Sequence, residues 1–210
     1  MLSGLLRLLI IIIILLIKVN YMSIENIVYE QPGKLLTDAA ILMITKDFSQ
    51  ETIMPVVARI MEFNLLPEEL RPPFITLIIN SPGGSVHSCF HLIDVIKSSK
   101  IPVHTIAQGL VASCGVLTLM AGEKGHRSVT HNTSIMSHTW SWGANGTSHD
   151  LDAIQKEFAQ STDRMVAHYK KCTGKSEAYI KKHLIGMVDN WMTPEEAVKH
   201  GIVDTIKETY

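Results

Sequence analysis

A short stretch of small residues, Gly109 to Gly115, separates a strand-like segment from a helix-like segment. Residues 102–108 alternate apolar and polar side chains as a strand does. Residues 116–122 are apolar, free of proline and closed by glycine, which favours a short buried helix. Ser113 therefore lies at a predicted helix N-terminus, where the first N–H groups lack internal partners and the helix dipole favours negative charge. A serine in this place is most often a helix cap, but the same place suits the nucleophile of an acyl transfer.

The segments on either side of Ser113 alternate between strand and helix patterns. Residues 75–80 predict a buried strand, residues 85–98 an amphipathic helix, and residues 128–138 another strand. Strands that follow one another through helices need crossover connections, so we predict an α/β fold with a parallel sheet. Further out, the sequence predicts strands at 26–28, 40–45 and 202–206, a helix capped by Ser49 or Thr52 with Pro55 in its first turn, a long helix from about 148 to 172, and shorter helices at 176–185 and 194–200.

A serine hydroxyl is a weak nucleophile at neutral pH and needs a base within hydrogen-bond reach. His138 is the candidate among the ten histidines, because it ends a predicted strand 25 positions after Ser113. The C-terminal ends of neighbouring parallel strands lie together, and open α/β sheets place their sites there. The alternative interpretation is a histidine that simply ends a strand.

Four motifs occur in order around these residues: Asn80-Ser81-Pro82-Gly83-Gly84, Ala112-Ser113-Cys114-Gly115, His138 at the end of a strand, and Asp189 ahead of Thr193-Pro194-Glu195-Glu196-Ala197. Together they resemble the proteolytic subunit family of the Clp protease (ClpP), serine peptidases of the crotonase-like fold. The resemblance extends from about Ile75 to the C-terminus. It implies repeated β-β-α units with a long helix that projects from the body and meets a subunit of an opposing ring.

The resemblance also implies a catalytic triad of Ser113, His138 and Asp189, in which Asp189 orients the base. On its own, Asp189 fits an ordinary loop aspartate. The family's second glycine, Gly84, and the residue after the nucleophile, Cys114, would supply the two backbone N–H groups of an oxyanion hole.

Three places depart from the family pattern. Cys114 stands where the family usually has methionine, which matters little because only its N–H is used. Thr139-Trp140 replaces Gln-Pro after the histidine, and Val188 and Asn190 flank Asp189 where the family often has an arginine that pairs across the ring interface. We therefore leave the backbone after His138 and the stability of a double ring open.

The composition excludes several classes of function. The 210 residues and 46% hydrophobic content suffice for one full core, while a net charge of −1 without a long basic run disfavours nucleic-acid binding. Three widely spaced cysteines favour a reducing compartment over a disulfide framework or a zinc site. The histidine pairs His87/His91 and His126/His131 have no carboxylate or cysteine at ligand spacing, so we predict no metal site.

Residues 1–21 differ from the rest of the chain. Leu8 to Ile17 is apolar over ten residues, which is too short to span a bilayer comfortably, and no small-residue cleavage site follows. We expect residues 1–21 to be an apolar extension or the result of a start codon placed upstream of Met22. Residues 22–210 then form the peptidase domain, in the cytoplasm, and a membrane anchor made by residues 1–21 is the alternative.

We therefore predict an ATP-dependent, Clp-type serine endopeptidase that hydrolyses unfolded proteins or peptides. The resemblance implies homo-oligomeric rings, heptamers that pair into a double ring, fed by an AAA+ ATPase unfoldase. The chain has no Gly-x-x-x-x-Gly-Lys loop, so we expect no cofactor and ATP use by the partner alone. Two alternatives stay open: a membrane-anchored serine protease like the signal peptide peptidases, with a serine–lysine pair, and a non-catalytic ClpP-like ring subunit.

Overall fold

The computed structural model describes residues 34–140, 145–186 and 188–208. The chain divides into two compact units, residues 1–41 and 42–210. In the first unit, the described part contains the short helix α2 (Lys34–Asp38). The predicted strand at 26–28 and the extension 1–21 lie outside the described residues. None of the helices in the described ranges is both long and apolar enough to cross a membrane.

Helices and strands alternate from β1 to β4, as the sequence predicts, and the order is less regular after that. In chain order, the elements are β1 (Ile41–Ile44), α3 (Gln50–Leu65), the 3₁₀ turn η1 (Glu68–Leu70), β2 (Ile75–Ser81), α4 (Val86–Ser98), β3 (Val103–Ala112), α5 (Cys114–Met120), β4 (Arg127–Thr130), β5 (Ser134–Ser137), α6 (Ser148–Thr173), α7 (Glu177–His183), β6 (Asn190–Met192), α8 (Pro194–His200) and β7 (Thr205–Lys207). The strands form one sheet in the order β1-β2-β3-β4-β7, with β5 beside β3 and β6 beside β5. The predicted α/β fold with a mostly parallel sheet is confirmed.

The central strand β3 changes its neighbour halfway along its length. Its first half pairs with β4 (Thr105–Ala107 against Arg127–Val129), and its second half pairs with β5 (Leu110–Ala112 against Ser134–Met136). Between the halves, three residues of β3 lie opposite the single residue Asn80 of β2, and Gly109 has a φ of 72°. The side chain of Asn80 accepts a hydrogen bond from Leu110 N–H (3.1 Å) and so replaces the interrupted ladder bond. This bulge directs the C-terminal half of β3, and Ser113 after it, toward β5.

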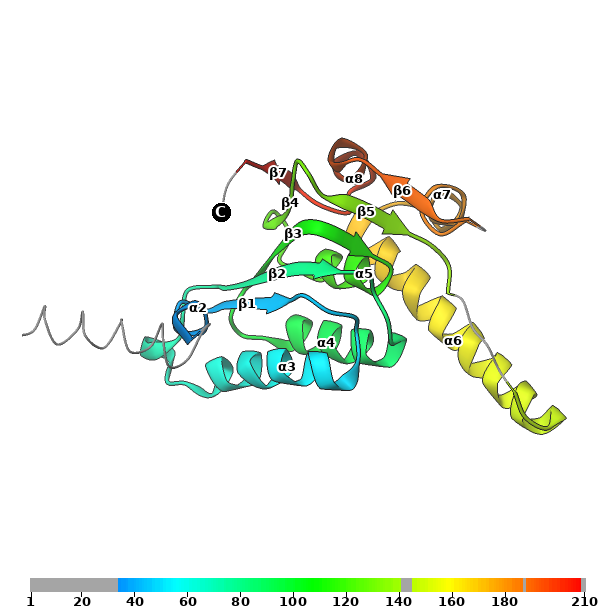
Figure 1. Ribbon diagram of the computed structural model, residues 1–210, viewed down its shortest axis with the longest axis horizontal. Coiled ribbons are helices and arrows are strands. Elements are labelled where there is room, and N and C mark those ends of the chain that lie inside the picture. Colours follow the sequence, from blue (N-terminus) through cyan, green and yellow to red (C-terminus); the bar gives the residue numbers. More distant parts are fainter. Residues whose placement is uncertain (1–33, 141–144, 187, 209–210) are drawn as a thin grey trace, which may run out of the picture. The chain divides into compact units, whose positions relative to one another are not determined.

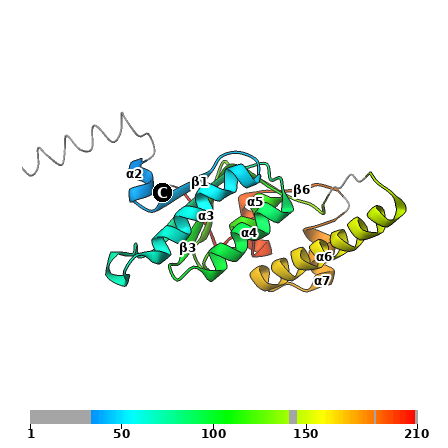
Figure 2. The same ribbon diagram turned by 90° about the horizontal axis from the view of Figure 1, so that it is seen from below.

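Helices α3 and α4 pack side by side on one face of the sheet, with α5 behind β2 and β3 (Figures 1 and 2). Their inward side chains are fully buried; they include Ile53, Val57 and Ile60 of α3, Leu92 of α4, and Leu117 and Leu119 of α5. Burial of each such side chain contributes roughly 1.5–3 kcal/mol. This core supports the strand ends that carry the candidate site.

Helix α6 buries only its second half. Its buried residues all lie from Ser161 onward, whereas Leu151 in its first turn is 42% exposed. Figure 1 shows the first half extending past the sheet, which agrees with the projecting helix that the resemblance implies. The helix begins with a capping box between Thr147 and Asp150 and ends at Gly174 in the left-handed conformation, close to the predicted bounds.

Four local predictions were wrong. Pro55 lies inside α3 rather than in its first turn, because the cap is Ser49, one of the two expected caps, whose Oγ accepts from Thr52 N–H. The segment 128–138 is two strands, β4 and β5, and not one. The helix predicted to run to residue 185 ends at His183, and the strand expected at 202–206 is the shorter β7. Strand β6 was not predicted at all.

Candidate active site

Ser113 lies between β3 and α5 in a conformation that few non-glycine residues adopt. Its φ is 54° and its ψ is −117°, a strained pair of backbone angles. Its N–H donates to Met136 O (2.9 Å), which extends the β3–β5 ladder up to the serine itself. Sharp strand-to-helix turns of this kind lift a nucleophilic side chain out of the end of a sheet. The side chain makes no capping hydrogen bond, so Ser113 is not acting as an ordinary helix cap.

The parallel pairing of β3 and β5 brings His138 to Ser113. His138 follows the last residue of β5 and lies two residues beyond Met136, the partner of Ser113 N–H. His138 Nε2 and Ser113 Oγ are 2.9 Å apart, within hydrogen-bond reach. The imidazole is 22% exposed, so it is open to a substrate.

The antiparallel pairing of β5 and β6 brings Asp189 to His138. Ser137 lies opposite Asn190, so the next residue outward on each strand, His138 and Asp189, also face each other. His138 Nδ1 and Asp189 Oδ1 are 3.2 Å apart. Asp189 is 57% exposed, and Asn190 Nδ2 holds the start of β6 by donating to His183 O (2.8 Å).

These contacts form an unbroken series from hydroxyl to imidazole to carboxylate. With the carboxylate accepting from Nδ1–H, Nε2 carries the lone pair that can accept the serine proton. The arrangement can activate Ser113 as a nucleophile and return the proton to a leaving group. The structure thus brings together the three side chains that the sequence nominated.

The loop of Gly83 and Gly84 closes over Ser113. A Cβ on Gly83 would lie 2.7 Å from Ser113 Cβ, and a Cβ on Gly84 would lie 2.5 Å from Phe48 O. Both residues also have positive φ, so each must be glycine for two reasons. Gly83 therefore lies directly against the candidate nucleophile. The N–H groups of Gly84 and Cys114 make no backbone–backbone hydrogen bond to another described residue.

Buried contacts fix the strand end that carries His138. Ser137 Oγ hydrogen-bonds to Tyr169 Oη of α6, and burial raises the pKa of Tyr169, which stays a neutral phenol. Trp140 is buried and packs edge-on against Phe90 of α4, with ring centroids 6.3 Å apart. Trp140, one of the two residues that depart from the family pattern after His138, is thus held by an aromatic contact. Trp140 Nε1 has no hydrogen-bond partner in the described part of the chain.

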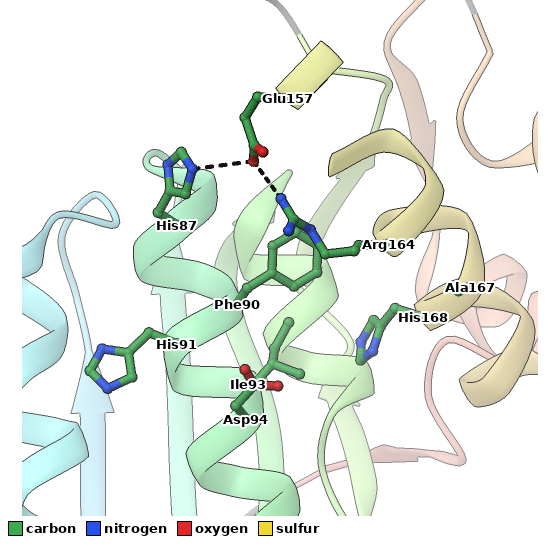
Figure 3. Close-up of a pocket in the computed structure, with 9 residues that line it drawn as sticks. All are labelled: His87, Phe90, His91, Ile93, Asp94, Glu157, Arg164, Ala167 and His168. Atoms are coloured by element: carbon green, nitrogen blue, oxygen red, sulfur yellow. Dashed lines mark hydrogen bonds and ion pairs between the residues drawn. The ribbon is translucent and has the colours of Figure 1, made fainter. Parts of the chain in front are cut away.

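A cavity of about 690 Å³ lies beside these contacts, between α4 and α6. Figure 3 shows His87 of α4 and Arg164 of α6 both reaching Glu157, with Arg164 above the ring of Phe90. Hydrogen bonds from Ser161 and then Arg164 lower the pKa of Glu157. None of the three triad candidates lines this cavity. The candidate catalytic side chains therefore lie at the strand ends and not in this cavity.

The histidine pairs considered for metal binding have other contacts. His87 reaches Glu157 (3.5 Å), and His126 stacks on His104 with centroids 4.0 Å apart. Within the ranges the structure describes, no three histidine, cysteine or carboxylate side chains gather as a metal site would require.

Two features of the site were not found from the sequence. Phe48 pairs with Gly84 in an isolated bridge, donating its N–H to Gly83 O (2.7 Å) and accepting from Ser85 N–H (2.6 Å). Because these hydrogen bonds use only backbone atoms, the side chain at position 48 does not reveal them in the sequence. Strand β6 is only three residues long, too short for its alternation to be recognised.

Comparison with known proteins gives a consistent result. Residues 25–210 match the family model described as Clp protease. The chain is 34% identical to the "ATP-dependent Clp protease proteolytic subunit" of Deinococcus radiodurans over 178 residues, 85% of this chain and 84% of that protein. It is 34% identical to "ATP-dependent Clp protease proteolytic subunit 2" of Corynebacterium diphtheriae over 188 residues, 90% of each. It is 38% identical to subunit 1 of Chlamydia abortus over 134 residues, 63% of this chain and 69% of that protein.

Proposed function

The chain belongs to the Clp protease family, whose proteolytic subunits are serine peptidases, and we propose that Ser113, His138 and Asp189 are its catalytic triad. Ser113 Oγ attacks the scissile carbonyl while His138 Nε2 takes its proton. His138 then gives that proton to the leaving amine, and water repeats the sequence on the acyl-enzyme. Asp189 holds the imidazole in the required tautomer and stabilises its charged form. The observation that carries the proposal is the series of contacts at 2.9 Å and 3.2 Å through His138.

We further propose that Gly84 N–H and Cys114 N–H form the oxyanion hole. Cys114 is the first residue of α5, where N–H groups have no helical acceptor and the helix dipole favours an anion. Gly84 lies on the loop whose other glycine contacts Ser113. Each such donor commonly supplies about 3–4 kcal/mol of transition-state stabilisation. The substrate main chain would lie extended along the glycine loop and pair with its backbone.

The natural assembly in this proposal is a homo-oligomeric ring, a heptamer able to form a double ring, with an AAA+ ATPase unfoldase as partner. The curated relatives carry "ATP-dependent" in their names, which supports an ATPase partner. Unfolded proteins and peptides are the substrates. Hydrolysis by a triad needs no cofactor of its own. At Asp189, Val188 is 77% exposed and Asn190 is bonded within the chain, so a double ring would need contacts other than the family's arginine pair.

We propose residues 22–210 as the peptidase domain, preceded by the extension 1–21, and a cytoplasmic location. The family model begins at residue 25, which supports the first boundary. The three cysteines are all free, which supports a reducing compartment.

The test combines active-site labelling with substitution of two histidines. A fluorophosphonate should label Ser113, identified by mass spectrometry, and His138→Ala should abolish both labelling and peptide hydrolysis. His131, which is exposed in the turn between β4 and β5, supplies the matched control, and His131→Ala should label normally. A His138→Ala protein that still labels and cleaves would favour the serine–lysine alternative, and a wild-type ring that never labels would favour the non-catalytic subunit.

A further inference from the structure

Two buried thiols hold the carbonyl groups of the two residues proposed to form the oxyanion hole. Cys114 Sγ donates to Gly84 O (3.3 Å), and Cys89 Sγ, on α4, donates to Cys114 O (3.4 Å). Both cysteines are fully buried, with 0% exposure. Each proposed oxyanion donor thus belongs to a residue whose own carbonyl is restrained by a thiol.

The backbone of the loop explains why these restraints matter. The peptide between Gly83 and Gly84 is planar and trans, so its N–H points opposite to its C=O. Because Gly83 O accepts from Phe48 N–H, Gly84 N–H points away from Phe48. The Gly83 N–H is held in turn by Ser81 Oγ (3.2 Å). Hydrogen bonds to Ser81 of β2 and to Phe48 therefore hold Gly83, and the hydrogen bond from the Cys114 thiol holds the carbonyl of Gly84.

Two consecutive hydrogen bonds, made by the two thiols, link α4 to the glycine loop. Cys89 also lies within 3.7 Å of Thr118 Oγ1 on α5, so it bridges α4 and α5 beneath Ser113. Burial raises the pKa of Cys89 well above its usual value, which keeps this thiol protonated and able to donate.

We propose that Cys89 and Cys114 are positioning residues that orient the oxyanion donors through these two hydrogen bonds. The proposal rests on the proposed function, because it presumes that Ser113 is the nucleophile and that Gly84 and Cys114 bind the oxyanion. It concerns the thiol of Cys114, not only its N–H. Residue 114 must therefore donate a hydrogen bond from its side chain as well as supply a backbone N–H. A side chain of similar size without a donor should lower kcat.

The experiment separates donor from shape at each cysteine. Cys114→Ser keeps a donor, and Cys114→Val removes it at similar volume. Cys89→Ser and Cys89→Ala make the same comparison at residue 89. Cys172, a buried residue of the last turn of α6, is not one of the thiols bonded to the proposed oxyanion residues and gives the control Cys172→Ala. The readouts are kcat and KM for a short fluorogenic peptide, per site titrated with fluorophosphonate, and the inhibition constant of a peptide boronate, whose tetrahedral adduct uses the oxyanion hole.

We expect Cys114→Val to lower kcat per titrated site by about 10- to 100-fold with KM nearly unchanged, because displaced donors weaken transition-state binding. The boronate inhibition constant should rise by a similar factor. Cys114→Ser should restore most of the loss, and Cys89→Ala should show a smaller loss of the same kind that Cys89→Ser reverses. Cys172→Ala should match wild type per titrated site.

Two outcomes would overturn the inference. The first is a Cys114→Val protein with wild-type kcat per titrated site and unchanged boronate binding, even if fewer sites titrate. The second is a loss that serine does not restore at either cysteine. If Cys114→Val fails to fold, the Cys89 pair decides the question alone. Failure of the proposed function looks different, since Ser113→Ala would then still cleave the peptide or the fluorophosphonate would label another residue.

Discussion

Two aspartates at opposite ends of the sheet differ in their surroundings: one lies in the candidate active site and the other in a buried ion pair. At the C-terminal end, Asp189 faces His138 across 3.2 Å and is 57% exposed. At the start of β4, Asp204 binds the guanidinium of Arg127 through two contacts, Nε–Oδ2 at 2.9 Å and Nη2–Oδ1 at 2.6 Å. Arg127 is 1% exposed and the Asp204 side chain 14%.

The buried pair makes several further hydrogen bonds. Asp204 Oδ2 also accepts from the backbone N–H groups of Gly125 and Arg127, and Arg127 Nη1 donates to Cys172 O at the end of α6. Burial acts to raise the pKa of Asp204, but the hydrogen bonds and charge of Arg127 lower it overall. Within the described ranges, the Asp189 carboxylate has one side-chain partner, His138. A carboxylate with several hydrogen-bond partners holds elements of the fold together. A carboxylate that has one partner and is exposed to water can instead stabilise a positive charge that forms on that partner.

Ser113→Ala should show the largest effect at the chemical end. Removal of the nucleophile is expected to lower kcat by about 10⁶-fold, as in other serine peptidase triads. The free energy of unfolding should change little, because the substitution removes a single hydroxyl, whose hydrogen bond to His138 Nε2 serves the proposed chemistry. Peptide hydrolysis and urea unfolding measure the two effects. Activity equal to wild type would place the nucleophile elsewhere.

Asp189→Asn should come next. It leaves the shape of the site intact but favours the wrong tautomer of His138, and a loss of up to about 10⁴-fold in kcat is expected. Since Asp189 is exposed, stability should stay within about 0.5 kcal/mol of wild type. An unchanged kcat would mean that another group orients the base.

Asp204→Asn should reverse the pattern. Breaking a buried ion pair by removing one partner costs about 3–5 kcal/mol, because the other charge is left buried and unpaired. The kcat per titrated active site should stay near wild type in the molecules that remain folded. Glu62→Gln is the control, because the Arg59–Glu62 pair is exposed and should contribute less than about 1 kcal/mol. A stable Asp204→Asn protein with impaired kcat would erase the distinction between the two ends.

Much of the fold could be predicted from local patterns in the sequence. The apolar runs of β2 and β3, the capping box at Thr193 and the glycine after α6 are all signals that neighbouring residues determine. Ser113 could be nominated because a strand pattern meets a helix pattern there. His138 followed because parallel strands end at the same edge.

The remaining features depend on contacts between distant segments. The polar residues 130–134 hold the turn between β4 and β5, but the different pairing of the two strands along β3 depends on the bulge at Gly109 in another strand. Asp189 could be nominated only by resemblance, since its place opposite His138 depends on the antiparallel pairing of β6. The support of the glycine loop by Phe48 uses backbone atoms alone and has no side-chain signature.

A comparison of two histidines predicts a smaller effect, on the pH dependence of stability. His138 is partly exposed and bonded to side chains that take part in the proposed chemistry, whereas His168 of α6 contacts Leu117 O through Nε2 (2.9 Å). Burial lowers the pKa of His168 to about 4, with nearby lysines and Arg127 adding to the effect. The folded protein therefore holds this imidazole neutral well below the pH at which an unfolded histidine is half protonated.

The sign of the resulting pH dependence follows from linkage. Below about pH 6.5 the unfolded chain binds a proton at His168 that the folded chain does not, so stability falls as the pH decreases toward 4. Allowing for the partial exposure of the ring, the expected loss between pH 7.5 and pH 5 is about 1–2 kcal/mol. His168→Gln keeps an N–H donor for Leu117 O but cannot titrate. In urea unfolding at pH 7.5, 6 and 5, this variant should lose less stability on acidification than wild type by that amount, while His131→Gln should follow wild type. Parallel curves for wild type and His168→Gln would show that burial does not lower the pKa of His168 in the folded protein.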